Sequence, residues 1–319
     1  MNLLFDHNLS FEKKALSVFK YQALECPIYS EYLNLLKIDI QKVNSIEAIP
    51  CLPIEFFKSH RIISRGKITQ KIFTSSGTDG QKLSQHHIAD LSIYEQSFIK
   101  GFEQFYGNPK DYRILALLPS YLEREGSSLV YMCQHLINLS QHSESGFYLN
   151  NLKELSKTLQ NNSDTKTILI GVSYALLDLA EQYPQALKNT IIMETGGMKG
   201  KRTEILKAEL HQILKSAFEL DTIHSEYGMT ELLSQAYSKG NGIFKTPPWM
   251  KIIIRDLQDP ISIVQGSKTG GINIIDLANI YSCSFIATED LGQINHDNTF
   301  ELKGRMYAAD IRGCNLLIQ

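Results

Sequence analysis

The stretch TILIGVSYALLDLAEQYPQALKNTIIMETGG, residues 167–197, decides the fold class of this chain. Its two short apolar runs, at 167–170 and 190–193, are typical of buried strands, and each is followed by apolar residues at helical spacing, at 174–183 and at 203–218. Strands and helices that alternate in this way predict a mostly parallel sheet flanked by helices, an α/β fold. Binding sites are then expected in the loops at the carboxyl ends of the strands.

The same alternation extends toward the N-terminus. Residues 114–118 form another compact apolar run, and the serines at the start of 127–133 can cap a helix. Apolar residues at three- and four-residue steps predict an amphipathic helix at 88–105. Residues 9–40 also have helical spacing, which is interrupted at Pro27. We therefore expect a helical segment ahead of the α/β region.

The two ends of the chain differ from the α/β pattern. Residues 47–57 hold two prolines among apolar residues, which favours an extended segment. From residue 241 the sequence consists of short β-rich pieces separated by turn residues, at 250–255, 261–264, 271–275 and 283–287. We expect one domain over residues 1–319, divided into a helical lead-in at 1–72, an α/β body at 73–240, and a β-rich lobe with a C-terminal tail at 241–319.

The composition is that of an ordinary globular protein, since 43% of the 319 residues are hydrophobic and 21% are charged. Lys and Arg number 32 against 34 Asp and Glu, and the resulting net charge of −2 disfavours binding to nucleic acid. No run of about eighteen apolar residues predicts a membrane span. The cysteines are widely spaced and never form a C-x-x-C pair, which disfavours a disulfide framework or a zinc site and favours a cytoplasmic protein.

A loop rich in hydroxyl groups, FTSSGTDGQK at 73–82, can cradle phosphate. Its two glycines let backbone N–H groups approach an anion, and its serines and threonines donate further hydrogen bonds. The loop does not match G-x-x-x-x-G-K-[ST], the phosphate loop of common nucleotide triphosphatases. An ordinary solvent loop has the same kind of composition and is the alternative.

Two further motifs follow in order, namely HSEYGMTEL at 224–232 and TEDLG at 288–292, the second followed by Gly304 and Arg305. Together with the hydroxyl loop, they resemble the adenylate-forming superfamily of acyl- and aryl-CoA ligases, nonribosomal-peptide adenylation domains and luciferases. Within it, the sequence is most similar to the acyl-protein synthetases of bacterial luminescence systems, the LuxE type, and next to phenylacetate-CoA ligases. Full ligases of the superfamily continue into a mobile C-terminal domain, and the resemblance implies that this chain lacks it.

The resemblance implies where ATP would bind. Its phosphates fall to the hydroxyl loop, at Thr74, Ser75, Ser76, Gly77, Thr78 and Gly80, with Lys82 as a further contact. Asp79 departs from the family's usual Thr or Ser and brings a negative charge beside the triphosphate. The turn at Glu194, Gly196 and Gly197 would lie against adenine, although a purely structural turn explains these residues almost as well.

The resemblance also assigns roles within the second motif. Tyr227, followed by Gly228, would stack on adenine, and Thr230 would hydrogen-bond the α-phosphate. Glu231 would bind Mg²⁺, a cation that prefers hard oxygen ligands. The alternative is a helix N-terminus with Thr230 as its cap and Glu231 near its positive end.

Three more residues complete the predicted site. Asp290 would accept hydrogen bonds from the ribose hydroxyls, and Arg305 would reach ribose or phosphate. His224 would line the pocket for the carboxylate, and a satisfied core histidine is the alternative. Each of the three residues would be unremarkable alone, so the prediction depends on the order of the motifs.

The reaction implied by the resemblance is the ATP-dependent activation of a fatty, aromatic or other hydrophobic carboxylic acid as acyl-AMP. In the acyl-protein synthetases the acyl group then passes to a cysteine of the enzyme, as a thioester, before delivery to a reductase or carrier partner. Cys314 is the cysteine placed to match. Two alternatives stay open, namely an acyl- or aryl-CoA ligase and a catalytically inactive nucleotide-binding scaffold for a partner enzyme.

Overall fold

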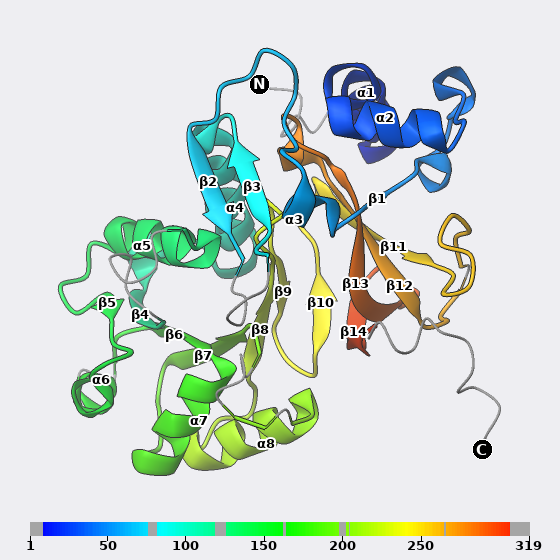
Figure 1. The fold of residues 1–319 in the computed structure, drawn as a ribbon. Helices are drawn as coiled ribbons and strands as arrows, with labels where there is room; N and C mark the ends of the chain where they lie inside the picture. Colours follow the sequence, from blue (N-terminus) through cyan, green and yellow to red (C-terminus); the bar gives the residue numbers. More distant parts are fainter. Residues whose placement is uncertain are drawn as a thin grey trace. The chain divides into compact units, whose positions relative to one another are not determined.

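The computed structural model describes residues 9–75, 82–118, 126–161, 164–197, 202–203, 205–264 and 266–306 (Figure 1). The chain divides into two compact units. The terminal unit comprises Met1–Gln70, His86–Ala89 and Pro248–Gln319, and the central unit comprises Lys71–Gln85 and Asp90–Pro247. Within the described ranges, no helix combines the length and the apolar character that crossing a membrane requires.

A mixed sheet forms the middle of the central unit, with the strand order β10-β9-β8-β7-β6-β4-β5. The strands from β8 to β5 run parallel, and β9 and β10 are added antiparallel. The mostly parallel sheet predicted from the sequence is therefore confirmed. The strands are β4 (Arg113–Leu117), β5 (Gly146–Phe147), β6 (Thr167–Val172), β7 (Thr190–Thr195), β8 (His224–Tyr227), β9 (Ala236–Ser238) and β10 (Ile243–Lys245).

Helices flank this sheet, with α4 and α5 packed together on one face and α7 and α8 on the other (Figure 1). The serine cap predicted from the sequence is confirmed, because Ser127 Oγ accepts a hydrogen bond from Val130 N at 3.4 Å where α5 begins. Asp90 caps α4 in the same way, through Ser92 N at 3.0 Å. The helices are α4 (Leu91–Tyr106), α5 (Ser128–Ser140), α6 (Leu152–Gln160), α7 (Ser173–Gln182), α8 (Lys207–Phe218) and the short 3₁₀ helix η3 (Pro109–Asp111).

Helix α8 begins later than the sequence pattern predicts. The helix was expected from residue 203, and the structure begins it at Lys207, after Leu206 in an extended conformation with φ −65° and ψ 143°. Arg202 forms ion pairs with Asp178 and Glu181 of α7. These ion pairs place the Arg202 side chain against α7, ahead of the first turn of α8.

The terminal unit contains the predicted β-rich lobe as an antiparallel meander, β11-β12-β13-β14, with β1 parallel to β13. The strand expected at 261–264 is wrong. Ser262 Oγ donates to Asp259 Oδ2 at 2.6 Å within a turn, and Ile263 makes an isolated bridge to Arg255. The strands are β1 (Leu52–Pro53), β3 (Gln85–Ile88, which begins in the central unit), β11 (Met250–Arg255), β12 (Gly270–Asp276), β13 (Phe285–Ile294) and β14 (Phe300–Arg305). Strand β2 (Lys71–Thr74) belongs to the central unit.

The helices predicted from the spacing at residues 9–40 are confirmed and pack within the terminal unit. Pro27 is the first residue of α2, where a missing N–H is tolerated, so it separates two helices. Gln22 Nε2 of α1 donates to Asn279 O at 2.8 Å, which joins α1 to the loop before β13. The extended segment expected at 47–57 is correct at β1 and wrong at both ends, because the 3₁₀ helix η2 extends to Ala48 and a helix begins at Phe56. The helices are α1 (Phe11–Glu25), α2 (Pro27–Leu35), α3 (Phe56–Ser59), η1 (Ile40–Lys42), η2 (Ile46–Ala48) and η4 (Leu277–Asn279).

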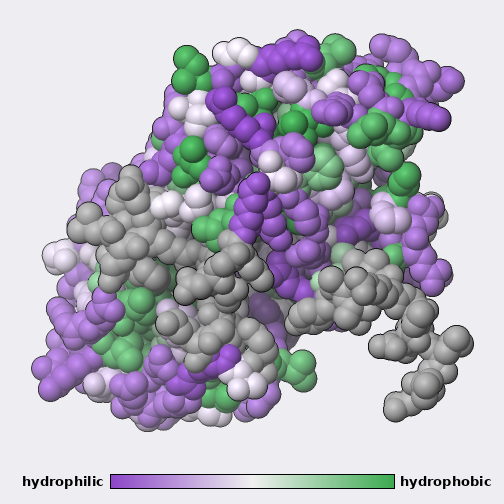
Figure 2. Space-filling view, viewed as in Figure 1, coloured by the Kyte–Doolittle hydropathy of each residue, from purple (hydrophilic) through white to green (hydrophobic). Residues whose placement is uncertain are grey.

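On the face drawn in Figure 2, apolar residues form small patches separated by hydrophilic ones. Leu206 and Ile243 are exposed apolar residues of the central unit, one immediately ahead of α8 and one in β10. Scattered apolar residues of this kind are normal on a soluble surface and carry no functional argument.

Candidate active site

The carboxyl ends of β7 and β8 bring two of the predicted motifs side by side. In the parallel register, Glu194 lies beside Ser225, and Thr195 lies beside Glu226. Side chains alternate along a strand, so Glu194 and Ser225 share one face of the sheet, and Thr195 and Glu226 share the other. The glycine-rich turn and the Tyr-Gly motif therefore leave the sheet from adjacent positions at the edge where ligands of α/β proteins bind.

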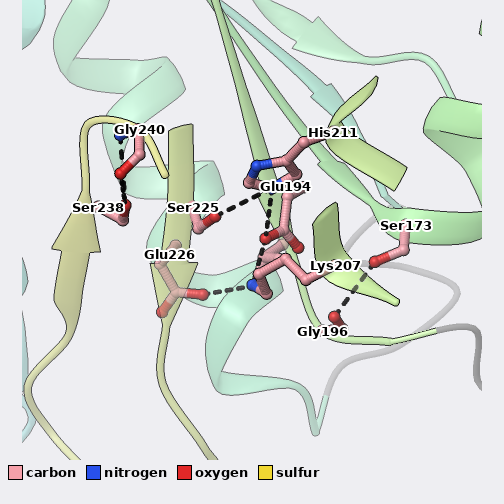
Figure 3. Close-up of polar contacts among 10 residues, drawn as sticks. Ser173, Glu194, Gly196, Lys207, His211, Ser225, Glu226, Ser238 and Gly240 are labelled. Carbon is pink, nitrogen blue, oxygen red and sulfur yellow. Dashed lines mark hydrogen bonds and ion pairs between the residues drawn. The ribbon is translucent and has the colours of Figure 1, made fainter. Parts of the chain in front are cut away.

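The carboxylate of Glu194 is surrounded by donors from α8 (Figure 3). Its side chain is 1% exposed, its Oε1 accepts from Lys207 Nζ, and His211 Nε2 lies 3.4 Å from the same oxygen. Ser225 Oγ lies 3.5 Å from His211 Nε2. Burial opposes the ionisation of Glu194, and the hydrogen bond from His211 and the charge of Lys207 outweigh it, so the pKa of Glu194 lies below its ordinary value. Glu194 is thus a buried anion neutralised by α8.

A second carboxylate, Glu226, lies on the opposite face of the sheet. Thr195 Oγ1 donates to Glu226 Oε2 at 2.5 Å. A Cβ added at Gly228 would come within 2.5 Å of Glu226 Oε1. A Cβ at position 228 would therefore push this carboxylate aside, and glycine leaves room for it.

The glycine-rich turn presents backbone to solvent. Gly196 has a φ of +65°, in the left-handed region that favours glycine. Ser173 Oγ, at the first residue of α7, donates to the carbonyl oxygen of Gly196 at 3.2 Å (Figure 3). Both Gly196 and Gly197 are exposed. The turn is thus accessible to a ligand and is held at its first residue.

The ring of Tyr227 is buried against β10. Tyr227 packs edge to face on Phe244, with 6.0 Å between the ring centroids. Lys207 Nζ lies 5.2 Å from the centroid of the same Phe244 ring, within the range of a cation–π contact. Lys207 therefore contacts the carboxylate of Glu194 directly and the ring of Tyr227 through Phe244.

The Thr-Glu pair of the same motif lies in a turn. Thr230 and Glu231 are enclosed by a turn in which Leu232 N donates to Met229 O at 3.1 Å, and the strand β9 follows. The alternative of a helix N-terminus at this position is wrong, because pairing of β9 with β8 takes the chain into the sheet. Thr230 is half-buried, and Glu231 is 5% exposed.

His224 is the first residue of β8 and is half-buried. Its Nδ1 lies 3.1 Å from the Tyr106 hydroxyl of α4. Burial, together with the positive charge of Lys239, lowers the pKa of His224 to about 4. The imidazole is therefore neutral at pH 7 and can act as a hydrogen-bond partner without a charge.

The hydroxyl loop is described at its two ends. Thr74 N donates to Gly126 O at 2.7 Å, and Ser75 Oγ accepts from Ser84 N at 3.0 Å. Lys82 is exposed. The remaining predicted members, and the predicted acyl acceptor, lie outside the described residues: Ser76, Gly77, Thr78, Gly80 and Cys314. Their roles stay predictions.

The last two predicted residues belong to the terminal unit, where adjacent strands bring them together. Asp290 of β13 is opposite Arg305 of β14, and Arg305 Nε lies 3.1 Å from Asp290 Oδ1. Asp290 N donates to Thr288 Oγ1 at 3.1 Å, which links the motif's threonine to its aspartate. The carboxylate of Asp290 is thus partly buried, and the side chain of Arg305 beside it is 65% exposed.

Sequence reasoning missed Lys207, His211, Ser225 and Glu226. Lys207 and His211 are four residues apart on α8 and therefore share one helical face, the arrangement that two donors to one oxygen require. The four-residue spacing is visible in the sequence, but it indicates a shared site only once the face of α8 that meets the sheet is known. Ser225 and Glu226 belong to the predicted motif at 224–232. Their pairing with β7 places Ser225 beside Glu194 and Glu226 beside Thr195, and the sequence alone does not show this register.

The residues of the central unit fit magnesium-bound ATP chemically. The turn at Gly196 offers exposed backbone, and Gly228 gives a close approach that a Cβ would fill. A single carboxylate such as Glu231 is sufficient for Mg²⁺ when substrate phosphates supply further oxygen ligands. Ser75 and Thr230 add hydroxyl groups that can donate to phosphate oxygens.

No protein-family model matches the sequence, and no curated protein matches it either. Solved structures do match the fold. ATP-bound MatB from Rhodopseudomonas palustris superposes with a TM-score of 0.57 at 16% identity, over 76% of this chain and 49% of that one. O-succinylbenzoate coenzyme A synthetase (MenE) from Bacillus subtilis, in complex with ATP and magnesium ion, gives 0.54 at 16% identity, over 75% and 50%.

An open conformation of 2-hydroxyisobutyryl-CoA ligase, in complex with 2-HIB-AMP and CoA, gives a TM-score of 0.66 at 12% identity, over 92% of this chain and 68% of that one. At such identities the likeness establishes the fold. The α/β fold predicted from the sequence is therefore confirmed, and it is shared with part of each of these ligase structures. The chain spans about half the length of MatB and MenE.

Proposed function

We propose that this protein activates a carboxylic acid by adenylation with ATP and Mg²⁺. The observation that carries the proposal is the juxtaposition, at the carboxyl edge of β7 and β8, of the glycine-rich turn and the Tyr-Gly-x-Thr-Glu motif. The MatB and MenE structures of similar fold are described as bound to ATP, and the ligase of similar fold is described with an acyl-AMP. Fold and motif order therefore support the same reaction class.

In the proposed reaction, a carboxylate oxygen of the acid attacks the α-phosphorus of ATP. The bond from that phosphorus to the bridging oxygen breaks, and pyrophosphate leaves with the electron pair. The acid is already ionised at neutral pH, so the step requires no general base. Its rate depends on how the protein positions the two anions and offsets their charge.

The roles of the protein's own residues follow from their chemistry. The hydroxyl loop would donate to the β- and γ-phosphates, and Thr230 would donate to the α-phosphate. Glu231 would hold Mg²⁺, which when bound offsets the charge on the phosphates. Asp290 would accept hydrogen bonds from the ribose, with Arg305 beside it.

His224 would face the acid as a neutral group. Its lowered pKa means that the ring adds no positive charge at pH 7, so it would orient the carboxylate by hydrogen bonding. Tyr106 would fix the orientation of the ring through Nδ1.

The finer proposal concerns the acceptor. A thiolate at Cys314 would attack the acyl carbon of the adenylate, the bond from that carbon to the phosphate oxygen would break, and AMP would leave. A hydrophobic acid and a reductase or carrier protein as final acceptor fit this proposal. Coenzyme A is the second candidate acceptor, supported by the ligase of similar fold that is described with CoA.

The proposed function is tested by exchange of labelled pyrophosphate into ATP over a panel of fatty, aromatic and short acids. We expect exchange that requires both an acid and Mg²⁺. Absence of exchange and of acyl-AMP across the panel, in protein that binds ATP, would support the inactive scaffold instead. Intact mass after incubation with ATP and an accepted acid then separates the acceptors. A hydroxylamine-labile adduct that Cys314→Ser removes supports the thioester, and turnover that depends on added CoA supports the CoA ligase.

A further inference from the structure

We propose that Lys207 is a positioning residue for the nucleotide, which holds the glycine-rich turn and the ring of Tyr227 in the arrangement that ATP requires. The inference rests on the proposed function and adds a residue that no motif contains. It assigns to Lys207 an effect on ATP affinity and not on the chemical step.

Glu194 is enclosed too completely to contact a ligand itself. Its side chain is 1% exposed, and it shares the sheet face of Ser225, toward Lys207 and His211 of α8 (Figure 3). The residue that the resemblance would place against adenine therefore has its carboxylate turned into the protein. Any effect of Glu194 on the nucleotide must be transmitted by the groups that it holds.

Both donors of α8 reach the two predicted nucleotide motifs, His211 through Glu194 and Ser225, and Lys207 through Glu194 and the Phe244 ring. The ammonium of Lys207 contacts the carboxylate of Glu194, two residues before Gly196. The same ammonium lies 5.2 Å from the Phe244 ring, and that ring packs on Tyr227 at 6.0 Å. The side chain of Lys207 is 36% exposed, whereas Glu194 is buried, so Lys207 connects the interior to the ligand-facing edge.

The contact also closes the base of the loop that contains the turn. The loop leaves β7 after Thr195 and returns at Lys207, the first residue of α8. Lys207 and Glu194 contact each other across these two ends, and Arg202 forms ion pairs with Asp178 and Glu181 of α7. Joining the ends of a loop reduces the conformations available to the turn between them.

Removal of the ammonium would leave an anion buried beside His211. A buried carboxylate that loses its cation either takes up a proton or draws its surroundings into a new arrangement. Both responses weaken the attachment of the start of α8 to β7, which His211 alone would then provide at Glu194, and remove the cation beside the Phe244 ring. The turn and Tyr227 would then be less well ordered before ATP binds. The free-energy cost of ordering them on binding would lower the affinity for ATP.

The test compares Lys207→Met with Lys207→Arg, Glu194→Gln and a matched control, Lys215→Met, which removes a positive charge from the last turn of the same helix. The readouts are kcat and KM in pyrophosphate exchange, with ATP and the acid varied separately, and direct ATP binding by calorimetry. We expect Lys207→Met and Glu194→Gln to raise the KM and Kd for ATP by about tenfold, with kcat and the KM for the acid within about twofold of wild type. Lys207→Arg, which keeps the charge, should recover most of the affinity.

A merely structural role would lower the apparent kcat in proportion to the loss of folded protein and leave the KM and Kd for ATP unchanged, and this outcome would overturn the inference. Equal ATP affinities of Lys207→Met and Lys215→Met would also overturn the inference. In that case, pyrophosphate exchange by the wild-type protein would still support the proposed function. A wild-type protein that neither binds ATP nor exchanges pyrophosphate would refute the proposed function and the inference together.

Discussion

Replacement of Gly228 by alanine tests whether the Tyr-Gly motif is held by the carboxylate beneath it. The added Cβ would lie 2.5 Å from Glu226 Oε1, which is closer than the 3.0 Å below which Cβ contacts essentially never occur in proteins. It would also lie 3.4 Å from Gln235 Cγ, at the limit of an ordinary van der Waals contact. The φ of Gly228 lies outside the left-handed region, so alanine adds no backbone strain. The effect of the substitution should therefore come almost entirely from displacing the carboxylate of Glu226.

The expected loss of stability follows from what Glu226 gives up. Its carboxylate must move by at least the difference between 2.5 and 3.0 Å, and its Oε2 accepts the short hydrogen bond from Thr195. A hydrogen bond to a charged group contributes about 1.5–3 kcal/mol. Alanine in place of glycine restricts the unfolded chain and offsets about 0.4–1 kcal/mol of this. If the hydrogen bond is lost, we expect the free energy of unfolding to fall by about 0.5–2.6 kcal/mol.

Equilibrium unfolding in urea, followed by circular dichroism, measures this change. Gly101→Ala in α4 is the matched control, because a Cβ there meets nothing within 4 Å and should raise stability slightly. The decisive comparison is Gly228→Ala in a Glu226→Ala background, where the clashing oxygen is absent. An equal loss of stability with and without Glu226 would refute the reasoning, since the clash could then not be its cause.

Further predictions concern single side chains of the central unit. Glu231→Gln should keep the fold and slow adenylation by about a hundredfold or more, since a charged Mg²⁺ ligand becomes neutral; a wild-type rate of pyrophosphate exchange would remove Glu231 from the site. Tyr237→Phe should leave the free energy of unfolding unchanged or raise it by up to about 1 kcal/mol, because the buried hydroxyl has no hydrogen-bond partner among the described residues; a clear loss in urea would contradict this. The pKa of His224 is about 4 in the folded protein and about 6.5 in the unfolded chain, so the unfolded chain binds a proton more readily as pH falls from 6.5 toward 4. The melting temperature should therefore fall over this range, and it should depend less on pH in His224→Gln.

The sequence predicted the order of the elements well where the signal is local. The apolar runs that became β4, β6 and β7 are fully or largely buried strands, and Ser127 caps the helix that its position predicted. Strands β9 and β10 have three residues each, and such short segments have no measurable periodicity. They exist because β8 offers an edge for pairing, which is a property of the folded sheet.

Non-local contacts also decide what the site residues do. Thr230 and Glu231 suit a helix N-terminus by local preference, and the pairing of β9 with β8 overrides that preference. Lys207 has the exposed, charged character of a solvated helix start until β7 places Glu194 beside it. The assembly of the terminal unit from distant segments depends in the same way on Gln22 reaching Asn279 and Ser284, contacts that no local pattern encodes.

Glu194 and Glu226, the two carboxylates at the carboxyl edge of the central sheet, have different surroundings. Glu194 faces cations of α8, while Glu226 faces a tyrosine-rich interior, where its charge adds to burial in raising the pKa of Tyr94 and Tyr237. Both carboxylates are buried and hydrogen-bonded within the protein, so neither is available to bind Mg²⁺ without breaking those bonds. Glu231 is buried to a similar degree, at 5% exposed against 7% for Glu226, so burial alone does not select the carboxylate that would hold Mg²⁺ under the proposed function. Pyrophosphate exchange in Glu231→Gln and in Glu226→Gln would select it, because loss of a charged Mg²⁺ ligand slows the chemical step, whereas loss of the Thr195 partner lowers stability.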